Sequence, residues 1–307
     1  MIIKVLKRTL LICLLLVIFT ISSLSKSINK PTNINILMPA PFAESTSGLV
    51  EEFNRKQNGI IHINVTKGPR ETESVSDLAI SSLLLGRSPF DIILMDVTWL
   101  PKYAKAGWLE PMNELFTNDD WNSLANGSRP GNKIEGILYR WPLTADMGLL
   151  YWRTDLMDKP PRTPEELLKI TLSLKNENKV RYGYVWQGRQ YEGLSCVFLE
   201  VLNGFGGLWM DESQNIYLDS KESLDAANWL NNLIKVGASP KSVTNFTENE
   251  ALQAFESGDA ALMRNWPYAW AELQKENSHV KGKVGITTMV SMDNESPTST
   301  LGSWGFS

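Results

Sequence analysis

The sequence contains few of the side chains that most often carry catalytic or metal chemistry. Its 307 residues include two histidines, His62 and His279, which lie far apart with no acids or cysteines at the spacing of metal ligands. A zinc site or a Ser-His-Asp triad needs such residues in a defined pattern, so we expect no metal, no cofactor and no catalytic residue. The glycine-rich run at 203–207 lacks both phosphate-binding patterns and predicts a turn at the end of a helix.

Cysteine is equally rare, which excludes a disulfide framework. Cys13 lies in an apolar run near the N-terminus, and Cys196 lies in an apolar stretch where we expect a buried thiol on a helix. Basic residues at 4, 7 and 8 precede the apolar run over 10–21, and serines follow it. Because a membrane-spanning helix needs about 20 apolar residues, we predict a cleaved secretory signal peptide over 1–25 rather than an anchor.

An excess of charge of either sign is also missing. The formal net charge is −4, so there is no electrostatic reason to bind nucleic acid or an anionic membrane surface. Hydrophobic residues make up 43% of the chain and charged residues 21%, which is ordinary globular composition, and the length suggests two domains. Tryptophan, in contrast, occurs 11 times, and its side chain combines a flat apolar face with a polar edge.

The first part of the mature chain alternates predicted strands and helices. Apolar runs predict strands over 34–38, 60–65 and 90–95, a loop follows the first of them, and amphipathic stretches predict helices over 48–57 and 71–85. This alternation implies parallel strands with helices on both faces of the sheet. Ligands of such sheets bind beyond the carboxyl ends of the strands.

A second unit is predicted to begin after 141–144. Thr163 and Thr247 are typical helix caps, and Thr247 forms a capping box with Glu250. The chain ends in an apolar, strand-like stretch at 302–307, and we therefore expect it to be a piece of a longer protein. The remaining predicted elements are strands over 147–152, 181–186 and 282–288 and helices near 191–202, 220–236 and 247–257.

Three acidic residues, Glu44, Asp96 and Asp146, each follow a predicted strand. Two carboxylates roughly 5–9 Å apart can hydrolyse a glycosidic bond. A single acid in this position is more often the cap of a helix or turn. The residues themselves leave both interpretations open.

Several local motifs occur in a fixed order along the chain. They are DIILMDVTWL (91–100), AGWLEP (106–111), DMGLLYWR (146–153), YVWQGRQYEG (184–193), FESGDAA (255–261), RNWPYAW (264–270), KGKVG (281–285) and LGSW (301–304). This set resembles the family 1 extracellular solute-binding proteins of ABC importers, which include maltose-binding protein. The resemblance is closest to the trehalose/maltose-binding branch and runs from about residue 33 to the last residue.

The resemblance implies an α/β, two-lobed periplasmic-binding-protein fold like that of maltose-binding protein, with a ligand cleft between the lobes. It implies a first crossing between lobes near 141–144 and a second near 286–290. The expected organisation is a signal peptide over 1–25, the first part of lobe 1 over 31–143, lobe 2 over 144–286 and a return to lobe 1 over 287–307. The rest of lobe 1 and the end of lobe 2 are expected to be missing from this sequence.

The resemblance also carries the sugar contacts of the family onto this sequence. Carboxylates accept hydrogen bonds from pairs of sugar hydroxyls, and aromatic faces cover the C–H patches of the ring. Arg70 is added as a hypothetical donor to hydroxyl oxygens, and Thr144 stands where the related branch has tyrosine, which leaves the ligand open. The implied positions are Glu44 in the loop after the first strand, Asp96 after the third, Asp146 past the first crossing, Trp266 and Tyr268 in the second lobe, and Gly302 and Trp304 at the return.

The remaining tryptophans are expected mostly in the packing of the two lobes. Trp186 lies at a predicted strand end, and the sequence leaves open whether it packs in the core or faces the ligand. The tryptophans assigned to packing are Trp99, Trp108, Trp121, Trp152, Trp209, Trp229 and Trp270.

The leading hypothesis is a monomeric, non-enzymatic periplasmic protein that captures a disaccharide or small glucoside. Trehalose, maltose, sucrose and glucosylglycerol are the expected ligand types, and the transmembrane subunits of an ABC permease are the expected partner. One alternative is a secreted glycoside hydrolase that uses two of the three acids Glu44, Asp96 and Asp146. Another is a binding protein that serves chemoreception.

Overall fold

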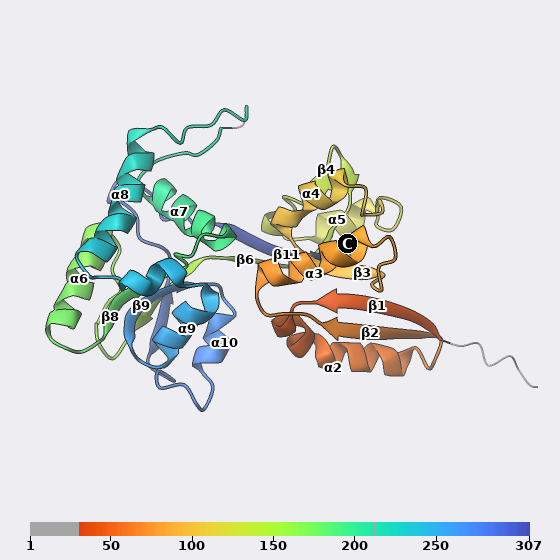
Figure 1. The fold of residues 1–307 in the computed structure, drawn as a ribbon, viewed down its shortest axis with the longest axis horizontal. Helices are drawn as coiled ribbons and strands as arrows, with labels where there is room; N and C mark the ends of the chain where they lie inside the picture. Colours follow the sequence, from red (N-terminus) through yellow and green to blue (C-terminus); the bar gives the residue numbers. More distant parts are fainter. Residues whose placement is uncertain (1–30, 212) are drawn as a thin grey trace, which may run out of the picture. The chain divides into compact units, whose positions relative to one another are not determined.

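The computed structural model describes residues 31–211 and 213–307 and has an α/β architecture (Figure 1). The predicted signal peptide lies outside the described residues. Residue contacts divide the described chain into two units. Unit 1 comprises residues 31–121, Gly131–Trp141 and Trp304–Ser307, and unit 2 comprises Asn122–Pro130 and Pro142–Ser303.

Unit 1 is built on a sheet whose first three strands follow the sequence prediction. The strands occur in the order β2-β1-β3-β11-β6, and β1 pairs in parallel with both β2 and β3, as predicted. Strand β11 pairs antiparallel with β3. The strands are β1 (Thr32–Met38), β2 (Ile61–Lys67), β3 (Ile92–Asp96), β6 (Trp141–Met147) and β11 (Leu301–Phe306). Residues 142–147 of β6 and 301–303 of β11 are counted with unit 2.

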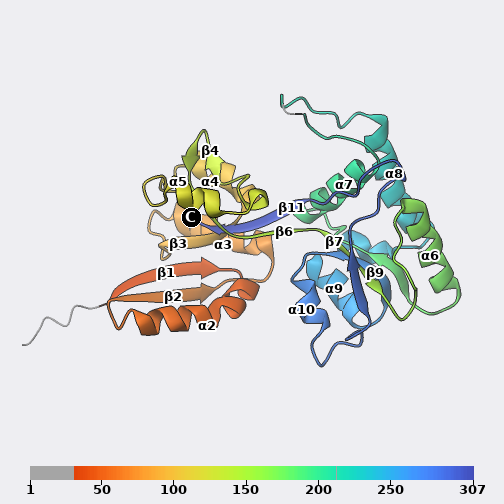
Figure 2. The same ribbon diagram turned by 180° about the vertical axis from the view of Figure 1, so that it is seen from behind.

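Helices and short strands complete the first part of the chain. Helix α2 runs along β2 and α3 packs near β3 (Figures 1 and 2), and Leu37, Val75 and Met95 lie in the buried core between sheet and helix. Burying these apolar side chains is the main source of stability of such a layer. The elements are α2 (Ala40–Lys56), α3 (Thr72–Leu84), η1 (Val97–Trp99), α4 (Leu100–Lys105), α5 (Asn118–Ser123), η2 (Asn126–Ser128), β4 (Lys133–Ile134) and β5 (Ile137–Leu138).

Helix α2 begins earlier than predicted. The sequence predicts a loop up to residue 47, but the helix begins at Ala40, directly after Pro39. Proline fits the first turn of a helix because the backbone N–H it lacks has no partner there in any case. Two prolines that suggest a loop therefore mark a helix start, and Glu44 lies on a helix rather than in a loop.

Unit 2 is built on a second sheet with helices on both faces. Its order is β10-β7-β9-β8, with β7 antiparallel to both β10 and β9 and β8 parallel to β9. Leu150 packs in the cluster under α6, α7 and α8, whereas its neighbour Tyr151 packs in the opposite cluster under α9 and α10 (Figures 1 and 2). The elements are β7 (Leu149–Arg153), α6 (Pro164–Asn176), β8 (Tyr182–Val185), α7 (Glu192–Gly204), α8 (Lys221–Lys235), η3 (Lys241–Asn245), α9 (Glu248–Glu256), β9 (Ala260–Asn265), α10 (Ala269–Leu273) and β10 (Val284–Thr287).

The predicted helix caps of unit 2 are confirmed. The Thr163 side chain accepts a hydrogen bond from the backbone of Glu166, at 3.1 Å. At α9, Thr247 and Glu250 form the complete capping box. These caps are local interactions, which is why the sequence alone predicts them.

Two boundaries differ from the prediction. A single strand is expected over 147–152, but the chain forms β6 and β7, which are separated at Gly148. The return to lobe 1 is expected at 287, yet residues up to Ser303 belong to unit 2. Met289 and Val290 are buried in the core of unit 2, and this burial keeps the segment there.

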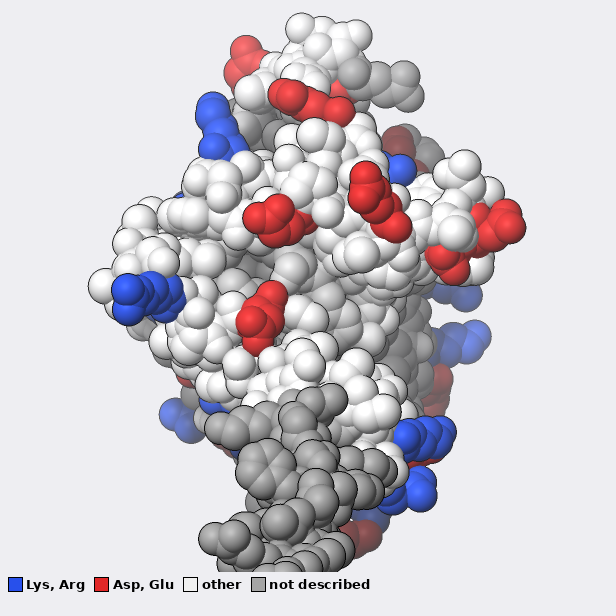
Figure 3. Space-filling model, turned by 90° about the vertical axis from the view of Figure 1, so that its right-hand side faces the viewer, with Lys and Arg blue, Asp and Glu red and all other residues white. Residues whose placement is uncertain are grey.

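The surface carries charges of both signs. Figure 3 shows one face, on which the acidic side chains of the described residues stand apart and basic ones lie toward the margins. Across residues 31–211 and 213–307, the helices all fall short of the length and apolar character needed to cross a membrane.

Candidate ligand-binding site

In unit 1, four of the predicted site residues lie at the carboxyl edge of the sheet. Glu44 lies on the helix after β1, Arg70 lies just after β2, and Asp96 ends β3. Trp304 on β11 is the register partner of Asp96. Parallel strands bring their carboxyl ends to one edge of a sheet, and that edge is where ligands of such folds bind.

The carboxylate of Glu44 lies among cations. Its oxygens are 3.1 Å from Nη2 of Arg70 and 2.5 Å from Nζ of Lys67. All three side chains are about half exposed, so water screens these pairs and their geometry can change at little cost. Arg70, whose position the sequence leaves unsettled, is thus a direct neighbour of Glu44.

Asp96 forms a cap as well as the end of a strand. Its Oδ1 accepts hydrogen bonds from the backbone N–H and the hydroxyl of Thr98, both at 2.8 Å. The capping interpretation of Asp96 is therefore confirmed. A carboxylate has about four lone-pair positions, so this role does not exhaust its capacity to accept hydrogen bonds.

The indole of Trp304 packs against two other aromatic rings of unit 1. Its centroid lies 5.2 Å from that of Phe42 and 5.5 Å from that of Trp99, which it meets edge-on. Phe42 lies on helix α2, two residues before Glu44. Trp304 is therefore held by the core of unit 1 and is only partly accessible.

In unit 2, three predicted residues from distant parts of the chain meet. A Cβ atom added to Gly302 would lie 2.1 Å from Oδ1 of Asp146 and 3.0 Å from the ring of Trp266. Only glycine leaves room for both groups, so the carboxylate, the indole and the backbone at Gly302 form one cluster. Asp146 and Trp266 are both partly exposed, so a carboxylate and an aromatic surface lie beside each other.

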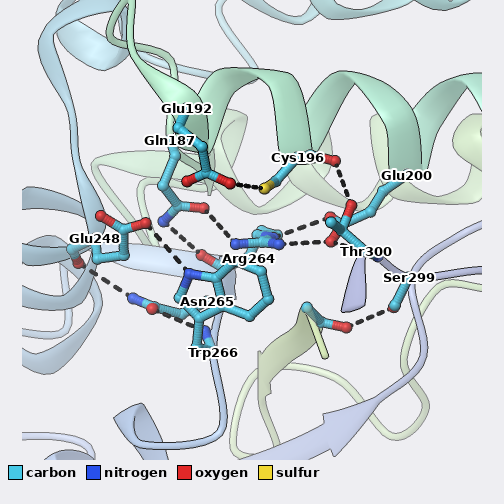
Figure 4. Close-up of polar contacts among 11 residues, drawn as sticks. Gln187, Glu192, Cys196, Glu200, Glu248, Arg264, Asn265, Trp266, Ser299 and Thr300 are labelled. Atoms are coloured by element: carbon cyan, nitrogen blue, oxygen red, sulfur yellow. Dashed lines mark hydrogen bonds and ion pairs between the residues drawn. The ribbon is translucent and has the colours of Figure 1, made fainter. Parts of the chain in front are cut away.

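Behind Trp266 lies a fully buried ion pair (Figure 4). Arg264 donates to both carboxylate oxygens of Glu200, with distances of 2.9 Å from Nε and 2.5 Å from Nη2, and both side chains are completely buried. The Arg264 guanidinium also lies 4.0 Å from the centroid of the Trp266 ring. Burial alone would lower the pKa of Arg264, but the carboxylate of Glu200 outweighs it and raises that pKa above its ordinary value.

Further hydrogen bonds hold the Trp266 indole from its polar edge. Its Nε1 donates to Oε1 of Glu248 at 3.2 Å, and its backbone N–H donates to the side chain of Asn265 at 2.9 Å (Figure 4). The hydroxyl of Tyr191 donates to the other Glu248 oxygen, at 2.7 Å. An indole whose edge and one face are engaged in this way has little rotational freedom left.

Tyr268 and the other aromatic residues of unit 2 are placed differently. Tyr268 is exposed at the start of α10, two residues after Trp266. Trp186, left open by the sequence, packs in the core and donates to Ser239 at 3.0 Å. Trp209 and Trp270, which the sequence analysis assigns to packing, are 38% and 43% exposed.

Cys196 is a free and buried thiol on α7, as predicted. Its Sγ lies 2.7 Å from Oε1 of Glu192 (Figure 4). Burial, together with the charge of Glu192, raises the pKa of Cys196 and keeps the thiol protonated. Among the described residues, no group of histidine, cysteine and acidic side chains is arranged to hold a metal ion.

The residues that support Trp266 are not among those predicted from the sequence. Glu200 is a lone acid at the end of the apolar stretch 193–200, and Arg264 opens the RNWPYAW motif. A charged residue inside an apolar helix and another inside a buried strand suggest a buried pair, but nothing local says that they meet. Lys67 contacts Glu44, and Phe42 contacts Trp304. No pattern in the sequence around Lys67 or Phe42 indicates these contacts.

The chain is similar in sequence to known transporter-associated binding proteins. The chain is 32% identical over 252 residues to a probable ABC transporter-binding protein of Deinococcus radiodurans, covering 79% of this chain and 59% of that protein. It is 25% identical over 186 residues to the maltotriose-binding protein of Pyrococcus abyssi, covering 60% of this chain and 39% of that protein. The chain thus spans less than two thirds of the length of these relatives.

The chain is also similar to a solved structure and matches a protein family over most of its length. The fold is similar to maltose-bound MalE3 of T. maritima, with a TM-score of 0.82 and 30% identity, covering 90% of this chain and 71% of that chain. The expected two-lobed α/β fold of periplasmic binding proteins is thereby confirmed. Residues 39–306 match the family of bacterial extracellular solute-binding proteins. The chain therefore belongs to this family, whose members bind solutes and are not enzymes.

Proposed function

We propose that this protein captures a disaccharide or small glucoside and delivers it to the transmembrane subunits of an ABC permease. Ligands of the trehalose, maltose, sucrose or glucosylglycerol type fit the proposal. The predicted signal peptide would place the protein in the periplasm. The two-lobed fold accounts for delivery, since a ligand with higher affinity for a closed form shifts the population toward it.

The cluster of Asp146, Trp266 and Gly302 in unit 2 is the observation that carries the proposal. A pyranose presents an apolar C–H face and a rim of hydroxyl groups. The partly exposed Trp266 indole suits the C–H face, and the adjacent Asp146 carboxylate suits a pair of hydroxyls. Gly302 keeps side-chain atoms out of the space where both groups lie.

The edge of unit 1 supports the same ligand class. Glu44 and Asp96 supply carboxylate oxygens, and Arg70 supplies N–H donors, at the sheet edge that binds ligands in related folds. The exposed pairs of Glu44 can exchange a cation for a sugar hydroxyl at small cost. The maltose bound to MalE3 and the maltotriose in the name of the maltotriose-binding protein point to glucosides as the first ligands to test.

Titration of the chain lacking residues 1–25 tests the proposal. Trehalose, maltose, sucrose, glucosylglycerol and glucose are added, with mannitol as an open-chain polyol, while tryptophan fluorescence and heat are recorded. We expect saturable binding of at least one glucoside in the micromolar range or tighter, as is usual for a site built of such groups. Absence of binding across the panel would overturn the proposal for these ligands.

A second measurement on the same samples addresses hydrolysis. Chromatography of the disaccharide after long incubation with the protein should recover it unchanged. Appearance of glucose would contradict a role in capture alone.

A further inference from the structure

The buried ion pair in unit 2 links two parts of the candidate site that lie far apart in the chain. Arg264 lies under Trp266, and Glu200 reaches the segment just before Gly302 (Figure 4). We propose that Arg264 and Glu200 are positioning residues, which hold the Trp266 indole and the 299–302 segment in one fixed arrangement for the ligand. This inference rests on the proposed function and names residues that act through Trp266 and Gly302.

The contact on the Trp266 side is a stacking contact. The guanidinium carbon of Arg264 lies 4.0 Å from the ring centroid, close enough for a cation–π interaction strengthened by the absence of water. Because Glu200 holds the guanidinium at two points, the plane of Arg264 cannot rotate freely. In a third contact, Nη1 of Arg264 donates a hydrogen bond to Oε1 of Gln187 at 3.3 Å. The indole thus rests on a support that is itself fixed.

Glu200 contacts the backbone of the segment just before β11. Oε1 of Glu200 accepts a hydrogen bond from the N–H of Thr300 at 3.2 Å. The Thr300 hydroxyl donates to the carbonyl of Cys196, and the Ser299 hydroxyl donates to the carbonyl of Gly148 at 2.6 Å. The segment that leads into Gly302 is therefore tied to α7 and to the junction of β6 and β7.

The junction itself is shaped around the ion pair. A Cβ atom at Gly148 would lie 2.0 Å from Oε1 of Glu200 and 2.5 Å from Nη2 of Arg264. The chain therefore leaves a gap at Gly148 that the ion pair fills. The pair thus contacts Trp266 and the segment before Gly302 directly, and Asp146 lies two residues before the gap that the pair fills.

Stability alone is a weak explanation for such a pair. Removing two charges from water costs several kcal/mol per ion, and apolar side chains of similar volume often replace a buried pair without loss. The double variant Arg264→Met with Glu200→Leu is therefore expected to fold. It removes the stacking cation and the acceptor for Thr300 while it keeps apolar volume in place.

The first readout needs no ligand. In the chain lacking residues 1–25, ¹⁵N-labelled tryptophan gives one indole N–H resonance for each residue, and Trp266→Phe identifies that of Trp266. We expect this resonance to shift and broaden in the double variant. A matched control is Arg153→Met with Asp155→Asn, which removes another ion pair of unit 2 whose Nη2–Oδ2 distance is 2.7 Å. The control should leave the Trp266 resonance in place.

The second readout is affinity for whichever sugar of the panel the unaltered chain binds. We expect the double variant to lose about tenfold in affinity, as for a site whose supporting residues have been removed, and the control to lose less than about twofold. If the unaltered chain binds no sugar, the proposed function fails, while the Trp266 resonance still decides whether the pair positions the indole.

Two results would overturn the inference. One is an unchanged Trp266 resonance in a folded double variant, and the other is unchanged sugar affinity in a variant whose resonance has moved. Should the double variant not fold, Arg264→Lys replaces it, because lysine keeps the charge opposite Glu200 but lacks the planar stack. The same shift and a smaller loss of affinity are then expected, and their absence would equally reject the positioning role.

Discussion

The ion pairs at or beside the candidate site residues lie in opposite environments in unit 1 and unit 2: they are exposed in unit 1 and buried in unit 2. In unit 1 the side chains of Glu44, Lys67 and Arg70 are 46%, 57% and 48% exposed. In unit 2 the side chains of Arg264 and Glu200 are both 0% exposed. Exposed pairs contribute little and rearrange easily, whereas a buried pair fixes its surroundings at a large desolvation cost. The charged side chains of unit 1 can therefore rearrange easily, whereas the ion pair of unit 2 fixes the groups around it.

The two candidate site tryptophans also differ in the groups that support them, which are apolar in unit 1 and polar in unit 2. Trp304 of unit 1 is held by the apolar rings of Phe42 and Trp99. Trp266 of unit 2 is held by polar partners, the guanidinium of Arg264 and the carboxylate of Glu248. The difference between the units thus lies in how each holds its aromatic surface, and substitutions should affect stability and binding in different proportions.

The largest effect is expected from Glu200→Leu. It leaves the buried guanidinium of Arg264 without its counter-ion, which should cost about 3–5 kcal/mol of unfolding free energy. Chemical denaturation measures this cost. The double variant Arg264→Met with Glu200→Leu should recover most of it, and a double variant as unstable as the single one would contradict the proposed origin of the effect.

Trp304→Ala and Trp266→Ala compare the two aromatic supports. Trp304→Ala should lower the unfolding free energy by about 3 kcal/mol, because it empties part of the unit 1 core. Both variants should weaken sugar binding by about 2 kcal/mol through lost stacking. Calorimetry and denaturation separate the two quantities. A folded Trp304→Ala protein with unchanged affinity would remove that residue from the site.

Gly302→Ala tests the crowded cluster of unit 2. The new methyl group would overlap the Asp146 carboxylate, and we expect a cost of about 1–3 kcal/mol, mainly in binding. Gly127→Ala is a suitable control because no atom lies within 4 Å of the added methyl group. Equal affinities of the two variants would show that the space beside Asp146 is not used by the ligand.

Asp96→Asn addresses the cap at the end of β3. Asparagine also caps, so the stability cost should stay below about 1 kcal/mol, whereas the loss of a charged acceptor should lower sugar affinity. Thermal unfolding and titration give the two values. Affinity that stays intact while stability falls would limit Asp96 to its capping role.

The smallest effect on stability is expected from Glu44→Gln in unit 1. Its exposed pairs with Lys67 and Arg70 should contribute less than about 1 kcal/mol, and less still at high salt. Denaturation at two salt concentrations measures this contribution. A cost comparable to that of Glu200→Leu would erase the contrast between the two units.

Much of the fold could be predicted from the sequence because its signals are local. The strand over 34–38 and the capping box of Thr247 and Glu250 depend on neighbours within a few residues. The start of α2 was missed because Pro39 and Pro41 serve equally well in a loop and in a first helical turn. The segment 287–303, which the sequence predicts as the return to lobe 1, is counted with unit 2, and its burial there depends on side chains far away in the sequence.

Local sequence patterns suffice to predict the alternation of strands and helices, the caps, the buried thiol of Cys196 and the motifs shared with solute-binding proteins. These properties follow from the order of residues over short spans. The folded chain, in contrast, is needed to see that Glu200 meets Arg264, that Gly148 leaves room for them, and that Asp146, Trp266 and Gly302 share one cluster. No local pattern encodes such meetings, because chain packing brings together groups that are distant in sequence and buries their charges only where each finds its partner.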